Sequence, residues 1–151
     1  TPSPKLPGTD GRKMSKSYGN TILITDPEPV VRQKLKTMVT DPARIRRTDK
    51  GDPDKCPVGD LHKIFSTPET LAKVYEGCRS AGIGCIECKS WAADGLMKVL
   101  RPIQERRANL TEAQAIEILS EGSRRAQVRA EQTMVEVRDA MQLTLTTVAS
   151  V

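Results

Sequence analysis

A helical pattern in the last third of the sequence limits the fold class more strongly than any other feature. From Thr111, a residue that caps helices well, to about Val148, aliphatic and small side chains recur mostly every three or four positions. Side chains spaced in this way share one face of a helix. We therefore expect one long helix here, with this stripe buried in the core. The stripe consists of Ile116, Leu119, Ala126, Ala130, Met134, Val137, Met141 and Leu145.

Capping and breaking residues divide the middle of the chain into shorter helices. The β-branched run 21–25 favours one short strand before them. Asp26, Asp60 and Thr67 are suitable N-caps for the first three helices, and Pro102 should kink the fourth. The expected helices cover residues 27–39, 60–65, 67–81 and 85–108.

The composition indicates a thin hydrophobic core. The 151 residues suffice for one domain, but aromatic residues make up only 3% of them, so aliphatic side chains and alanine must form the core. Residues 1–20, rich in proline and glycine, are expected to form a flexible loop arm that precedes an all-α helical bundle. Because the chain starts at Thr1 without a methionine or a signal peptide, we expect a piece of a longer protein.

Hydropathy, charge and cysteine usage indicate the compartment and the kind of partner to expect for this protein. No stretch is long and apolar enough to span a membrane. The net charge of +5 suits a polyanionic partner but does not identify one. Since nothing marks the chain as secreted, we expect a reducing, cytoplasmic compartment in which the four cysteines are free or metal-bound.

The pentapeptide Lys13-Met14-Ser15-Lys16-Ser17 is the strongest candidate for a binding site. Lysine ammonium groups suit phosphate oxygens, and serine hydroxyls and backbone N–H groups add short hydrogen bonds. Gly8, Gly11 and Gly19 would let the loop bend closely around a ligand. These residue types together indicate a triphosphate-binding loop, while composition alone also allows a solvated basic loop.

The four cysteines are a second candidate site. Cys56, Cys78, Cys85 and Cys88 have the spacing C-x21-C-x6-C-x2-C. Structural zinc sites usually contain two close cysteine pairs, and this chain has one, while a [4Fe–4S] cluster tolerates unequal spacing. From the spacing alone zinc, a cluster, and cysteines that only pack or pair as disulfides all stay open.

Three groups of arginines are more typical of solvated surfaces, and the functional alternative is a groove that contacts RNA phosphates. The aromatic residues Phe65, Tyr75 and Trp91 could stack on bases or belong to the core. His62 has no catalytic partner at motif spacing and is interpreted as structural or exposed. The arginines are Arg44, Arg46 and Arg47, then Arg101, Arg106 and Arg107, and finally Arg124, Arg125 and Arg129.

The pentapeptide is identical to the KMSKS signature of class I aminoacyl-tRNA synthetases. The sequence around it, from Leu6 to Thr21, resembles bacterial tryptophanyl-tRNA synthetases, and the similarity covers most of the chain but weakens over the last 40 or so residues. A tyrosine-specific enzyme is an alternative, because the two synthetases are closely related. Further similar runs are 39–44, 51–53, 56–57, 81–85 and 100–103.

The resemblance implies a tryptophan–tRNA ligase that activates tryptophan with ATP and transfers it to tRNA(Trp). Lys13 and Lys16 would be catalytic, stabilising the departing pyrophosphate together with Mg²⁺. Gly11, Met14, Ser15 and Ser17 would complete the ATP-binding loop. Residues 1–25 would end a Rossmann catalytic domain that is otherwise missing, together with its HIGH motif and amino-acid pocket, and 26–151 would form the anticodon-binding domain. The chain alone would thus be inactive and could be a monomer, whereas the full-length protein would be a homodimer.

Some members of this family carry a [4Fe–4S] cluster on a C-x22-C-x6-C-x2-C pattern. The present chain resembles that branch, with a first interval one residue shorter, so Cys56, Cys78, Cys85 and Cys88 are the implied cluster ligands, with Zn²⁺ as the alternative. Two other interpretations stay open. One is a non-catalytic RNA-binding module with a structural metal site made of the four cysteines, and the other is a zinc-stabilised helical protein with a chance pentapeptide.

Overall fold

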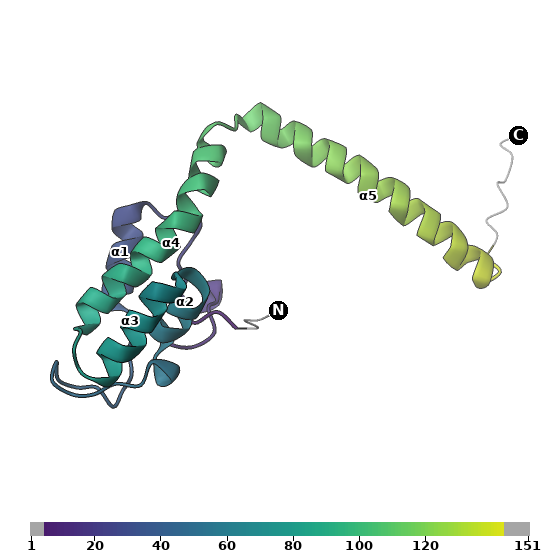
Figure 1. Ribbon diagram of the computed structural model, residues 1–151. Coiled ribbons are helices and arrows are strands. Elements are labelled where there is room, and N and C mark those ends of the chain that lie inside the picture. The colour runs from purple at the N-terminus through teal and green to yellow at the C-terminus, as the bar shows by residue number, and fades with distance from the viewer. Residues whose placement is uncertain (1–4, 144–151) are drawn as a thin grey trace, which may run out of the picture. The chain divides into compact units, whose positions relative to one another are not determined.

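The computed structural model describes residues 5–143 and contains only helices and loops within that range. This confirms the all-α fold class (Figure 1). The α-helices are α1 (Glu28–Thr37), α2 (Pro57–Phe65), α3 (Pro68–Arg79), α4 (Cys85–Ala108) and α5 (Glu112–Ala140), and two short 3-10 helices are η1 (Lys16–Tyr18) and η2 (Pro53–Lys55). None of these helices is long and apolar enough to cross a membrane.

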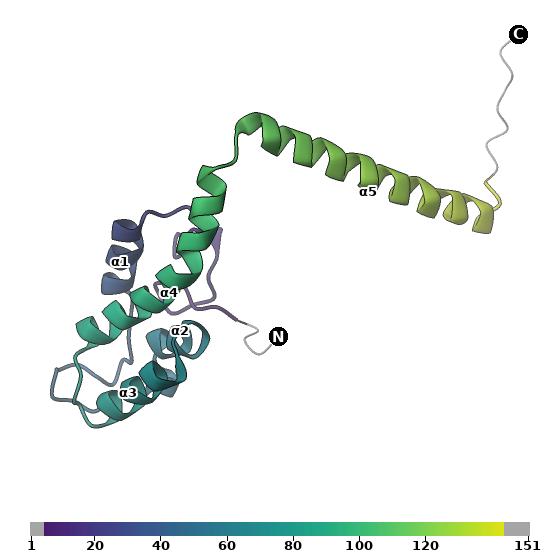
Figure 2. The ribbon, with the colours of Figure 1, turned by 45° about the horizontal axis from the view of Figure 1, so that its top comes forward.

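The described residues form two compact units that divide after Arg107. In the first unit α1 lies on one side of α4, and α2 and α3 lie on the other (Figures 1 and 2). The core between them is aliphatic, as the composition predicted, with Phe65 only packed against its edge. The buried core residues are Val31, Leu35, Met38, Cys56, Val58, Leu61, Ala92, Ala93, Leu96, Met97 and Leu100.

Polar contacts hold α1 against α4. The Arg32 guanidinium lies 2.7 Å from the Asp94 carboxylate, and Arg101 lies 2.7 Å from Glu28. On the other side of the core, α2 approaches η2 so closely that a Cβ on Gly59 would lie 2.0 Å from the Pro53 carbonyl oxygen. Only glycine fits at that position without a shift of the backbone.

The region before α1 differs from the prediction. Residues 21–25 form no strand, because no neighbouring segment offers them a backbone ladder; the chain turns at this point instead. Asp26 does not cap α1, since Pro27 occupies the N-cap position. The Asp26 carboxylate instead accepts hydrogen bonds from the Leu23 N–H, at 2.8 Å, and from the Lys34 ammonium, at 2.6 Å. It therefore closes the turn in front of the helix.

The other helix ends follow their capping residues more closely. Thr67 caps α3 by accepting a hydrogen bond from the Thr70 N–H at 3.3 Å, as expected. Helix α4 covers the expected residues and contains Pro102. Helix α2 starts at Pro57, one turn earlier than expected, because a proline suits the first helical position and Asp60 then lies inside the first turn.

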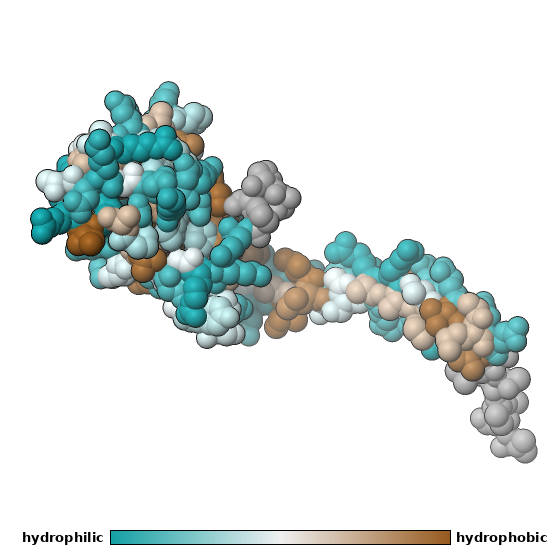
Figure 3. All heavy atoms as spheres, turned by 90° about the horizontal axis from the view of Figure 1, so that it is seen from below, coloured by the Kyte–Doolittle hydropathy of each residue, from teal (hydrophilic) through white to brown (hydrophobic). Residues whose placement is uncertain are grey.

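The second unit contains α5, and here the expectation of a buried stripe is wrong. Thr111 and Gln114 form a reciprocal capping box, which confirms the start of the helix. The helix ends at Ala140 rather than near Val148, a position that lies outside the described residues, as does Leu145. The described stripe residues are exposed, with Ile116 at 56% and Leu119 at 69% of their full area, and Figure 3 shows apolar atoms at the surface of this unit.

The physical reason for this difference is simple. A sequence period shows which side chains share a face of a helix, but it does not show what covers that face. Within its own unit α5 is the one described helix, so none of its residues is buried.

Candidate phosphate-binding loop and cysteine cavity

The pentapeptide lies in a tight loop that backbone hydrogen bonds close at its base. The Met14 N–H donates to the Leu6 carbonyl at 2.9 Å, and the Gly8 N–H donates to the Arg12 carbonyl at 2.7 Å. The Val39 N–H, just after α1, donates to the Thr9 carbonyl at 3.0 Å and attaches the loop to the helical unit. The loop is therefore an ordered part of the first unit rather than a free arm.

Asn20 holds this loop together from inside. Its side chain is buried at 2% exposure, and its amide nitrogen donates to the Asp10 carboxylate at 2.7 Å and to the Lys13 carbonyl at 3.2 Å. Its amide oxygen accepts from the Ser15 N–H at 2.8 Å. A Cβ on Gly8 would lie 2.3 Å from the Asn20 amide nitrogen, so the glycine makes room for this clamp.

The two lysines of the pentapeptide point into solvent. Lys13 and Lys16 are exposed, and within residues 5–143 neither forms an ion pair with a carboxylate. Ser17 is exposed next to them, whereas Met14 and Ser15 are half-buried. Two free ammonium groups on an ordered loop form a site that attracts an anion.

Glycine supports the loop at its turns. Gly11 has a φ of 80°, and Gly19, which ends η1, has a φ of 63°. Both values lie in the left-handed region that residues with a Cβ rarely adopt. Between these turns, Arg12 forms an ion pair with Asp10 at 2.7 Å. The hydrogen bond from Asn20 is the largest influence on Asp10 and, with Arg12, lowers the pKa of its carboxyl group.

The structure brings all four predicted metal ligands to one small cavity. Cys56 is the N-cap of α2, Cys78 lies near the end of α3, and Cys85 and Cys88 lie in the first turn of α4. The cavity has a volume of about 20 Å³ and is also lined by Thr40, Asp41, Arg44 and Val58. All four cysteines are free thiols, which excludes disulfides between them in this structure.

The four thiols line one cavity but do not converge on a common point. Within the described part of the chain, no three Cys, His, Asp or Glu side chains come close enough together to hold one metal ion. A [4Fe–4S] core places its thiolates at separate corners, so four thiols around one cavity, and not converging on one point, are compatible with it. The donor set itself, four thiols, suits either a cluster or zinc.

Two of the four thiols, those of Cys78 and Cys88, lie in a poorly solvated environment. Burial, with a smaller contribution from the other three cysteines, raises the pKa of Cys88 to about 12. Burial also raises the pKa of Cys78, although the nearby Arg44 opposes this effect. His62 is fully buried beside Cys88, with Nε2 3.1 Å from the Cys88 carbonyl oxygen and Nδ1 2.7 Å from Ser66 Oγ. Burial lowers the pKa of His62, so the ring is a neutral, structural group.

The first group of arginines surrounds a surface hollow of about 710 Å³. Arg46 is exposed there, Ile45 is 87% exposed, and Arg47 donates hydrogen bonds to the Ala81 and Gly82 carbonyls. Trp91 also lines this hollow. In the other two groups, Arg101 and Arg124 form ion pairs with carboxylates, so the first group offers the clearest anion-binding surface.

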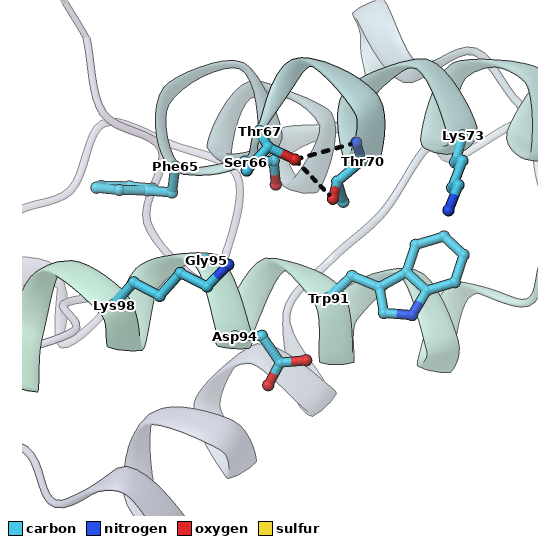
Figure 4. Close-up of a pocket in the computed structure, with 9 residues that line it drawn as sticks. All are labelled: Phe65, Ser66, Thr67, Thr70, Lys73, Trp91, Asp94, Gly95 and Lys98. Carbon is cyan, nitrogen blue, oxygen red and sulfur yellow. Dashed lines mark hydrogen bonds between the residues drawn. The ribbon is translucent and has the colours of Figure 1, made fainter.

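Trp91 also lines a second pocket, of about 310 Å³, between the start of α3 and the middle of α4. Figure 4 shows that Lys73 on α3 points across the pocket toward the Trp91 ring. Asp94 at the floor of the pocket is engaged by Arg32 at 2.7 Å. Trp91 is thus a wall of two hollows rather than a core residue.

A comparison with known families decides the relationship. The family described as tRNA synthetases class I (W and Y) matches residues 1–101, which is most of the chain and contains both the loop and the cysteines. The chain belongs to this class I synthetase family. The C-terminal limit of the match lies near the boundary between the two compact units.

Individual members of the synthetase family show the same similarity. The chain is 47% identical to a tryptophan–tRNA ligase of Ralstonia nicotianae over 95% of its own length and 36% of that protein. It is 51% identical to a tryptophan–tRNA ligase of Deinococcus radiodurans over 89% of its length and 42% of that protein. The chain therefore spans less than half the length of these curated relatives.

A solved structure agrees with the sequence comparisons. Tryptophanyl-tRNA synthetase from Campylobacter jejuni, crystallised with ADP and tryptophan, superimposes with a TM-score of 0.74 and 26% identity. The similarity covers 92% of the present chain and 44% of that protein.

Reasoning from the sequence missed the contacts of three residues near the two candidate sites. Asn20 carried no motif signal except its place directly after the glycine that ends the pentapeptide loop. Arg44 was grouped with its surface neighbours, although the structure buries it beside Cys78. His62 was recognised as structural, but its contact with a predicted metal ligand depends on the packing of α2 against α4.

Proposed function

We propose that this chain supplies the ATP-binding KMSKS loop and the tRNA-binding helical part of a tryptophan–tRNA ligase. The observation that carries the proposal is that Lys13 and Lys16 are exposed and form no ion pair with any carboxylate of residues 5–143, on a loop that Asn20 holds in shape. The names of the relatives favour tryptophan over tyrosine, since they are tryptophan–tRNA ligases.

In the proposed reaction, the carboxylate of tryptophan attacks the α-phosphate of ATP. The bond to the bridging oxygen breaks, and pyrophosphate leaves with the negative charge. Lys13 and Lys16 stabilise this developing charge, and each such preorganised donor contributes about 10²- to 10³-fold in rate. Mg²⁺, bound with ATP, neutralises further phosphate charge. This step gives tryptophanyl-adenylate. The terminal ribose hydroxyl of tRNA(Trp) then attacks the carbonyl carbon of the adenylate, so that an ester to the ribose forms, the bond to the phosphate oxygen breaks and AMP leaves.

The remaining loop residues position these two lysines. Ser15 and Ser17 donate hydroxyl hydrogen bonds to phosphate or to the loop backbone, and Gly11 allows the backbone to close over ATP. Met14 anchors the loop to the body of the protein. We assign residues 1–25 to the end of the catalytic domain and 26–151 to the anticodon-binding domain of a cytoplasmic homodimer that also binds tryptophan.

The tRNA would contact the hollow beside the first arginine group. Arg46 offers an exposed guanidinium for phosphates, and Trp91 offers a ring face for an unpaired base. If the chain has no catalytic role, the same surface would serve the alternative function, a non-catalytic RNA-binding module.

The four cysteines are proposed to hold a [4Fe–4S] cluster, with Zn²⁺ as the alternative. Their common cavity and the absence of disulfides between them support this proposal. The bound group would supply a structural cross-link between α2, α3 and α4, which adds to a core that lacks large aromatic side chains.

The decisive experiment replaces each lysine in the full-length ligase. Lys13→Ala and Lys16→Ala should each lower ATP–pyrophosphate exchange by about 10²- to 10³-fold while tRNA affinity changes little. Lys50→Ala is the matched control, because Lys50 is an exposed lysine outside the pentapeptide loop. Equal losses of exchange and tRNA affinity, or no loss of exchange, would favour the RNA-binding module instead.

A further inference from the structure

Arg44 is a buried cation with an incomplete set of partners. Its residue is only 8% exposed, and the Nη2 group donates to the Ile83 carbonyl at 2.6 Å and to the Arg47 carbonyl at 3.1 Å. The Nη1 group lies 3.8 Å from Cys78 Sγ. The Nε–H is buried and has no hydrogen-bond partner within the described residues. An arginine keeps its charge in proteins, so the positive charge needs compensation.

The neighbouring protein groups compensate this charge only in part, through a longer-range attraction to the Asp41 carboxylate. No carboxylate of the described residues lies within ion-pair distance of Arg44. Asp41 lines the same cavity, but its oxygens accept hydrogen bonds from the Ala43 N–H at 2.9 Å and the Asp52 N–H at 2.8 Å. Neutral thiols are also poor partners for a buried cation. Four thiolates around an iron–sulfur core or a zinc ion, by contrast, leave a net negative charge in the cavity.

The backbone is shaped to keep Arg44 against the thiols. A Cβ on Gly51 would lie 2.7 Å from Cys78 Sγ and 3.0 Å from Arg44 Cδ. The Gly51 N–H also donates to the Cys78 carbonyl at 3.0 Å. Glycine at this position therefore lets the guanidinium and the sulfur lie side by side, and the two carbonyls that bind Nη2 prevent the guanidinium from turning away.

We propose that Arg44 is a positioning residue that balances the negative charge of the metal–thiolate centre and directs its free N–H groups into the cysteine cavity. This inference rests on the proposed metal centre. It assigns a role to Arg44 that its neighbours Arg46 and Arg47 do not share, because neither of them lines the cavity.

Arg47 provides a matched control in the same loop. It also donates two hydrogen bonds to backbone carbonyls, those of Ala81 and Gly82, in the same turn that binds Arg44. It differs in being exposed and, within the described residues, in donating no hydrogen bond to a thiol, whereas Arg44 Nη1 lies 3.8 Å from Cys78 Sγ. A comparison of Arg44→Gln with Arg47→Gln therefore separates the compensation of the centre's negative charge from the simple loss of hydrogen bonds to backbone carbonyls.

The experiment reconstitutes the chain anaerobically with ferrous iron and sulfide, and a parallel sample with zinc. We expect Arg44→Gln to bind its centre about 10- to 100-fold more weakly, as the loss of an outer hydrogen-bonding partner usually does. Retention of iron or zinc is measured as the number of metal ions bound per chain at increasing concentrations of a chelator. Arg44→Lys, which keeps the charge, should recover part of the loss, and Arg47→Gln should behave like the wild type.

The reduction potential of a reconstituted cluster gives a readout that misfolding does not reproduce. Removal of a nearby positive charge should lower the potential in Arg44→Gln, and Arg44→Lys should restore much of it. If the wild type binds only zinc, the role of Arg44 is tested by chelator competition alone, which compares zinc retention in Arg44→Gln, Arg47→Gln and the wild type. A wild type that binds neither centre overturns the metal site itself, whereas equal behaviour of Arg44→Gln and Arg47→Gln overturns the role of Arg44 alone.

Discussion

Replacement of Asn20 by alanine tests whether the KMSKS loop must be preorganised to work. Asn20 is buried and makes no proposed contact with ATP, yet it accepts a hydrogen bond from the Ser15 N–H and donates one to the Lys13 carbonyl. Each buried hydrogen bond contributes about 0.5–1.5 kcal/mol net, so these two backbone contacts stabilise the loop by about 1–3 kcal/mol. Since about 1.4 kcal/mol corresponds to a factor of ten, the ordered loop should become about 5- to 150-fold less populated relative to open forms.

The effect should be visible without any reaction. Amide hydrogen exchange at Ser15 should accelerate by a similar factor in Asn20→Ala, because its N–H loses its acceptor. In the full-length ligase, ATP–pyrophosphate exchange should fall although Asn20 makes no proposed contact with ATP. Asn109→Ala is the control, since Asn109 is exposed in the segment between α4 and α5. Unchanged protection at Ser15 together with unchanged exchange would refute the idea that Asn20 holds the loop.

Two further predictions concern the helical unit. Burial raises the pKa of Cys88 from 9.0 to about 12, so the folded state favours the protonated thiol. The free energy of unfolding of the metal-free chain, measured by urea denaturation, should therefore fall as the pH rises from 9 toward 12. The variant Cys88→Ala should show a weaker dependence of this free energy on pH. In the second case, Gly59→Ala should destabilise the chain by about 1–3 kcal/mol, since its Cβ would meet the Pro53 carbonyl. Gly122→Ala in α5, where a Cβ meets nothing within 4 Å, should instead be neutral or stabilise by up to about 1 kcal/mol in the same assay.

Local signals in the sequence located several elements correctly. Thr67 and Thr111 are caps whose side chains reach N–H groups only three residues ahead, so their effect depends little on the rest of the fold. The same holds for Gly11 and Gly19, which have the positive φ that the loop requires. Interactions that span so few residues can be predicted from the local sequence alone.

Other predictions failed because they needed knowledge of partners distant in the sequence. The run 21–25 has strand-forming residues, but a strand also needs a neighbour to pair with, and the described structure offers none. Asp26 had the right position for an N-cap, yet Lys34, further along α1, engages its carboxylate instead. Burial of the α5 stripe depended on a covering surface that no helical period can specify.

The sequence by itself determined the helical class, the KMSKS loop and the identity of the four cysteines, because residue type, spacing and local caps suffice for these features. Only the tertiary structure decided that the cysteines, which come from three different helices or their caps, line one cavity with Arg44. It also decided that Asn20 is the internal clamp of the loop. The physical reason is that burial and hydrogen-bond pairing depend on which segments pack together, and that choice belongs to the whole fold.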